Sequence, residues 1–67
     1  MQLNNVIVDF VDEKSKNTWF SAELPDVPRV GEGVGVGGGG FTVVDVWWNL
    51  EDNRGIVVVV VLRPLPK

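Results

Sequence analysis

Five segments of the chain have the alternating or densely apolar pattern of β-strands. We expect strands over residues 3–11, 18–24, 34–36, 41–48 and 56–63. Valine dominates these segments, and its branched Cβ favours the pleated sheet over the helix. Turn-forming stretches separate them at residues 13–17, 25–28, 37–40 and 49–55. Because no segment has the composition of a helix, the pattern predicts an all-β fold.

The spacing of these strands predicts one domain over residues 1–67, a five-stranded antiparallel barrel or sandwich without substantial helix. No connection is long enough for a helical crossover between parallel strands, so we expect only antiparallel pairs. Asn17 and Gly55 are expected to adopt left-handed conformations in their turns. The four glycines of residues 37–40 are expected to form a flexible connection.

Alternation assigns the faces of the first two strands. Val8 and Phe10 belong to the expected core face of the first strand. Phe20 and Ala22 belong to the core face of the second, which leaves Trp19 on its polar face. The two amino-terminal strands therefore have one apolar face each.

The last two strands are apolar on both faces. One face of the fourth strand carries Phe41, Val43, Asp45 and Trp47, and only Asp45 marks that face as outward. The fifth strand has valine, isoleucine or leucine at every position from 56 to 62. Burying a valine or larger side chain contributes about 1.5–3 kcal/mol, so the outward face needs a cover. Closure of the barrel, a second copy of the chain or another protein would supply one.

Composition excludes several classes of function. The chain has nine acidic and six scattered basic residues, a net charge of -3, and therefore lacks the basic surface of a nucleic-acid-binding protein. It contains no cysteine or histidine, so disulfides and ordinary zinc sites are not expected. The amino terminus lacks the pattern of a secretory signal, and the longest apolar run is too short to span a membrane. We expect a cytoplasmic protein that contacts neither nucleic acid nor membrane.

Residues 27–36 (VPRVGEGVGV) and 41–46 (FTVVDV) form a run that resembles the P-x-x-G-(D/E)-x-V … (Y/F)-x-V-x-x-V pattern of SH3-like small β-barrels. The resemblance covers about half of the chain and departs from the pattern at Gly33 and Gly35, where a side chain is usual. It implies a fold but no activity, because this fold carries many functions.

The sequence contains few residues that could act in catalysis. Histidine, cysteine and tyrosine are absent, so no serine or threonine has a histidine to activate it. The paired acids Asp12-Glu13 and Glu51-Asp52 lie in predicted turns. Asp45 lies within a strand, where a backbone hydrogen bond, an arginine partner or water is expected before a functional role. We therefore expect a protein that is not an enzyme and has no catalytic residue, cofactor or metal.

Two features indicate binding. The tryptophans Trp19 and Trp47, with Asp45, form the expected outward cluster, and tryptophan is enriched where interfaces gain most of their energy. The amides around Gly38 and Gly39 could form an anion-binding nest, although the match to G-x-G-x-x-G follows from glycine content alone.

Three hypotheses follow from these features. The first is a binding or adaptor module that self-associates, or binds a protein partner, through the fifth strand and Trp19, Phe41, Val43, Asp45 and Trp47. The second is a protein that binds or sequesters a nucleotide or another small anion by tryptophan stacking and by the amides of residues 37–40, Gly38 and Gly39 among them, such as a phage or mobile-element accessory factor. The third is a non-catalytic subunit of a larger enzyme.

Overall fold

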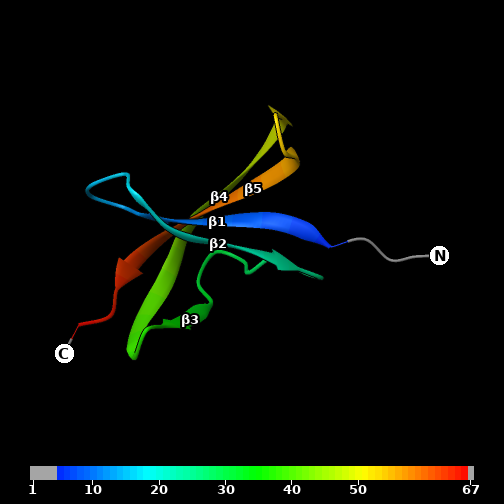
Figure 1. Cartoon of the computed structure of the whole chain (residues 1–67). Coiled ribbons are helices and arrows are strands. Elements are labelled where there is room, and N and C mark those ends of the chain that lie inside the picture. Colours follow the sequence, from blue (N-terminus) through cyan, green and yellow to red (C-terminus); the bar gives the residue numbers. More distant parts are fainter. Residues whose placement is uncertain (1–4, 67) are drawn as a thin grey trace.

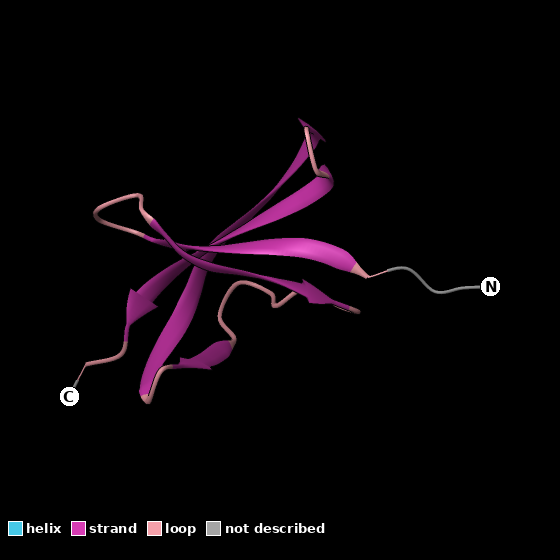
Figure 2. Ribbon diagram, viewed as in Figure 1, coloured by secondary structure: helices cyan, strands magenta, loops and turns pink. Residues whose placement is uncertain are grey.

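A computed structural model describes residues 5–66, and these contain five strands and no helix. The strands are β1 (Val6–Asp12), β2 (Thr18–Leu24), β3 (Gly33–Val36), β4 (Gly39–Asp52) and β5 (Gly55–Pro64). They form one sheet in the order β2-β1-β5-β4-β3 (Figure 1). The sheet is strongly twisted and curls into a half-barrel (Figure 2). The predicted all-β class is therefore confirmed.

The sheet is mixed, and the expectation of a purely antiparallel fold is wrong. β1 and β5 run parallel, with Val8 beside Val58 and Phe10 beside Val60. The other three strand pairs are antiparallel. A helical crossover is not needed here, because β2, β3 and β4 themselves form the connection between the two parallel strands.

The core lies on one side of the sheet, which we call the inner face. Its buried side chains come from β1, β4 and β5: Val8, Phe10, Val43, Val58, Val60 and Leu62. From β2, Ala22 packs against them and Phe20 stacks on Phe10, with the ring centroids 4.8 Å apart. Each buried side chain contributes about 1.5–3 kcal/mol to folding. The core faces expected for the first two strands are confirmed.

A bulge in β4 divides the side chains that alternation assigned to one face. Val43 lies opposite Leu62 but Asp45 lies opposite Val61, so Val44 is an extra residue. Consequently, odd-numbered residues face the core before the bulge, and even-numbered residues face it after the bulge. Val43 is only 1% exposed and belongs to the core, so its expected outward orientation is wrong.

A second irregularity reorients Trp19. Phe20 lies opposite Phe10 and Thr18 opposite Val11, so Trp19 is the extra residue of β2. Its ring lies 4.6 Å from that of Phe41, centroid to centroid, and Phe41 packs against the core. The expectation that Trp19 lies on the polar face of its strand is therefore wrong.

The glycine run forms a tight hairpin rather than the expected flexible connection. Gly37 and Gly38 have φ angles of 57° and 86°, close to those of a type I′ turn. Val36 pairs with Gly39 directly across the turn, and Gly40 continues β4. Glycine is favoured at both turn positions because other residues rarely adopt positive φ.

The remaining turns match the expectations in part. Gly55 has the predicted positive φ, at 105°. In the first turn the left-handed residue is Lys16, with φ 66°, rather than Asn17. The carboxylate of Asp12 accepts the backbone N–H of Ser15 at 2.7 Å, which fixes the turn from its first residue.

Candidate binding site

A groove of about 520 Å³ lies on the opposite side of the sheet, the outer face. Its lining residues come from β1, β4, β5 and the first turn: Val11, Glu13, Lys16, Val44, Asp45, Trp47, Val59, Val61 and Arg63. Trp47 lies opposite Val59 and is 54% exposed. The groove thus combines an apolar floor, an exposed indole and a charged rim.

Asp45 reaches the rim because of the bulge at Val44. Without that extra residue, Asp45 and Trp47 would share the inner face with Val43. Asp45 is exposed, and its Oδ1 accepts the N–H of Val46 at 2.9 Å. The carboxylate therefore accepts a hydrogen bond from the adjacent backbone, which is one of the alternatives that the sequence analysis gives for Asp45.

An ion pair closes one side of the groove. The guanidinium of Arg63 donates to both carboxylate oxygens of Glu13, at 2.9 and 2.8 Å. These hydrogen bonds lower the pKa of Glu13 and raise the pKa of Arg63. Since Arg63 is already engaged, Lys16 is the cation of this rim more readily available to a ligand.

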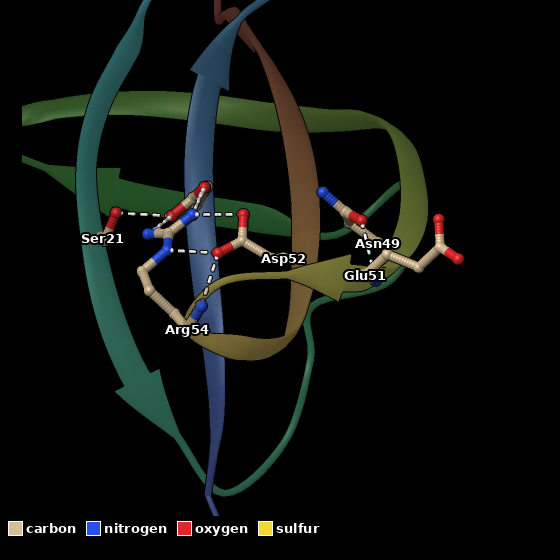
Figure 3. A network of polar contacts seen from close by, with 6 residues as sticks. Ser21, Asn49, Glu51, Asp52 and Arg54 are labelled. Carbon is tan, nitrogen blue, oxygen red and sulfur yellow. Dashed lines mark hydrogen bonds and ion pairs between the residues drawn. The ribbon is translucent and has the colours of Figure 1, made fainter.

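A second polar cluster covers the other end of the outer face. Arg54, in the β4–β5 turn, donates to both oxygens of Asp9 at 3.1 and 2.9 Å, and its Nε donates to Asp52 at 2.9 Å. Ser21 of β2 donates to Asp9 from the opposite side. Figure 3 shows Ser21 of β2, Asp52 at the end of β4 and Arg54 of the turn pointing toward one another. Through Asp9, these hydrogen bonds connect the tip of the β4–β5 hairpin to β1 and β2.

The carboxylates of this cluster are held ionised. The side-chain hydrogen bond from Arg54 lowers the pKa of Asp52 from 3.8 to about 2 and also lowers that of Asp9. The guanidinium in turn has a raised pKa. A general acid near neutral pH needs a raised carboxyl pKa, which is the opposite shift. The cluster is consequently suited to holding the hairpin rather than to proton transfer.

A groove of about 430 Å³ opens on the inner face. Val46 and Trp48 of β4 form one wall, with Val6 nearby, and residues 25–30 between β2 and β3 form the other. Trp48 is 53% exposed. The two adjacent tryptophans of β4 therefore border grooves on opposite faces of the sheet.

The distal half of the β4–β5 hairpin carries four of the eight exposed large apolar side chains among residues 5–66. Leu50 is 66% and Ile56 is 51% exposed, beside the half-exposed Trp47 and Trp48. Figure 1 shows this end of β4 and β5 extending well past β3. Isolated exposed apolar residues are common, but four within one short hairpin, spread over both of its faces, indicate an interaction surface.

The outer groove brings together only two of the predicted binding residues, Asp45 and Trp47. Trp19 and Phe41 contact each other at the edge of the core instead. Gly38 lies in the β3–β4 turn, away from both grooves, and Gly39 pairs with Val36 in the sheet. Their backbone therefore has an established structural role.

Sequence reasoning missed the inner groove and the exposed end of the hairpin. Alternation places Trp48 on the face opposite Trp47, and the structure confirms this direction, but the side chain is half-exposed rather than buried. Leu50 was counted as part of a loop, whereas β4 continues to Asp52. A useful signal is the adjacency of Trp47 and Trp48, since neighbouring residues of a regular strand point to opposite faces.

Within residues 5–66, no group of three or more acidic, histidine or cysteine side chains is placed to hold a metal ion. The same residues contain no helix of the length and apolarity that crossing a membrane requires.

Comparisons of the chain with protein-family models, with curated proteins and with solved structures find no match.

Proposed function

We propose that this protein is a non-catalytic binding module that self-associates through the distal part of its β4–β5 hairpin. The observation that carries the proposal is the exposure of Trp47, Trp48, Leu50 and Ile56, each more than half exposed in one hairpin. Tryptophan contributes disproportionately to interfaces because it buries a large area at low entropic cost. A second copy of the chain would cover these side chains.

The exposed area indicates the strength of the association. A tryptophan buries about 150–250 Å² when covered completely, so a half-exposed one offers about 100 Å². Four such side chains on each of two copies offer about 800 Å², below the roughly 1,200–2,000 Å² of stable interfaces. We therefore expect a dissociation constant in the micromolar range rather than the nanomolar range.

The fold-level part of the proposal is an SH3-like barrel. Its support is the sequence run at residues 27–36 and 41–46, together with a five-stranded curled sheet. The half-barrel is left open along β2 and along the distal part of β4, where a partner could complete it. We propose that the module works in the cytoplasm, because it carries no cysteine.

Two matched variants test the binding surface. Trp47→Gln should shift the protein toward monomer in size-exclusion chromatography with light scattering, because it removes an exposed indole. Glu23→Gln introduces the same side chain on β2, outside both grooves, and should leave the mass unchanged. Equal masses for both variants and the parent across the whole concentration range would show that Trp47 takes no part.

A small-molecule ligand is the second candidate function. The outer groove has the size of ordinary ligand pockets, about 300–1,000 Å³, and it places Lys16 beside Trp47. An anion with an aromatic ring, such as a nucleotide, would find both a cation and a stacking surface there. Titration of a nucleotide panel should quench the tryptophan fluorescence of the parent but leave that of Trp47→Gln, which comes from Trp19 and Trp48, unchanged. Flat titrations would reject this candidate.

A further inference from the structure

The outward edge of β4 is paired over only part of its length. β3 pairs with residues 39–42, and the N–H and C=O of Val43 bind Glu32 and Gly31. No other strand among residues 5–66 pairs with residues 44–52 on this side, because β4 has only β3 and β5 as neighbours. Figure 1 shows β4 continuing past the end of β3. This stretch of backbone thus has no neighbouring strand on that side, and a new strand would take over the Val46 N–H that now binds Asp45.

The hydrogen bonds show which groups face this edge. The N–H of Val46 binds the carboxylate of Asp45, so it is turned away from β5. Alternate residues of an antiparallel strand direct their N–H and C=O to the same side. Trp48 therefore also directs its backbone groups to the free edge.

The inner groove lies beside the free edge. The side chains of Val46 and Trp48 form its wall, and these are the residues whose backbone faces the edge. A strand that pairs with this edge would direct alternate side chains into the groove. Recognition by strand addition combines these two elements, backbone hydrogen bonds and pockets for alternate side chains.

We propose that the occupant is the β4 strand of a second copy, paired antiparallel and centred on Trp48. This inference rests on the proposed self-association and specifies its geometry. An antiparallel pair is its own complement under a two-fold axis, so one edge serves both copies. We call the paired segment of the two β4 strands the seam. In the seam, Val46 lies opposite the second copy's Leu50, which is the most exposed apolar residue of the strand. The pairing brings that side chain next to Val46, which lines the inner groove of the partner.

Charge limits the seam to residues 46–50. None of these five residues is charged, so the net charge of -3 does not oppose their pairing directly. At each end Asp45 lies opposite the second copy's Glu51, and like charges in opposed positions destabilise a strand pair. Five residues span about 17 Å at 3.4 Å per residue. A short seam of this kind agrees with weak, reversible association.

Hydrogen–deuterium exchange at several protein concentrations tests the pairing in the unmodified protein. Resolved by NMR, the amide of Trp48 should exchange at least tenfold more slowly at a concentration that favours the dimer than at one that favours the monomer. Exchange of the Trp48 amide that does not depend on concentration, in a protein that does dimerise, would overturn the edge pairing but not the self-association. A monomer at every concentration would overturn both.

A pair of lysine variants separates edge pairing from packing of the faces. Leu50 and Ile56 are both more than half exposed, but only Leu50 lies on the free strand. Leu50→Lys should weaken dimerisation at least tenfold, whereas Ile56→Lys, which leaves the paired segment of β4 unchanged, should weaken it by a clearly smaller factor. Equal weakening by both variants would show that the copies meet through the hairpin face, and would refute the edge pairing.

Discussion

The bulge in β4 leads to a prediction that differs from the one that simple alternation of side chains would give. Alternation assigns Val44 to the core and Val43 to the outside. The structure reverses this, because Val43 is 1% exposed and Val44 is only half-buried at the extra position. Replacing each valine by alanine should therefore have unequal effects on the free energy of unfolding.

The magnitude follows from burial. Val43→Ala deletes two buried methyl groups at about 0.8 kcal/mol each. The cavity left behind adds to this, so the loss should be about 2–3 kcal/mol. Val44→Ala removes partly solvated groups and should lose less than about 1 kcal/mol. A domain of this length has about 3–10 kcal/mol of stability at 0.05–0.15 kcal/mol per residue, so the first loss is large.

Urea unfolding followed by tryptophan fluorescence measures both variants against the parent. Unchanged m-values would confirm that the difference in midpoint reports stability rather than a change in the unfolded state. A larger loss for Val44→Ala than for Val43→Ala would refute the bulge and restore simple alternation along β4.

Further predictions concern acid stability and the glycine turn. Because the pKa of Asp52 is about 2 in the folded protein and 3.8 ordinarily, the unfolded chain binds more protons between these values, and stability should fall as pH drops from about 4 to 2. Urea midpoints across this range should fall less steeply in Arg54→Met; an unaltered slope would contradict the assigned ion pair. Gly38→Ala should cost about 1 kcal/mol, because a positive φ strains alanine. Gly37→Asn should be nearly neutral in the same urea assay, since asparagine is favoured at that position of a type I′ turn. Equal losses would exclude this turn type.

Much of the fold could be predicted from local chemistry. Valine-rich segments and turn residues gave the five strands, and alternation identified Val8 and Phe10 as core residues. The parallel pairing of β1 and β5 could not be derived, because it depends on how the three intervening strands curl the sheet. Topology of this kind is a property of the whole chain rather than of any connection.

The candidate site was less predictable because two bulges determine which side chains face it. Each adds one residue to a strand, which reverses the faces of all residues beyond it. Trp19 and Val43 were therefore misplaced, while Trp47 kept its predicted direction. Nothing in the local sequence distinguishes Val44 from its valine neighbour as the extra residue. The backbone register alone decides which of the two is buried.

Sedimentation equilibrium of the unmodified protein from about 5 to 500 µM tests the central claim most directly. We predict a reversible monomer–dimer equilibrium, with the mass-average rising from that of one 7.4 kDa chain toward twice that value. A single species of 7.4 kDa at every concentration would contradict the account, since the exposed tryptophans of β4 would then have no second copy to cover them.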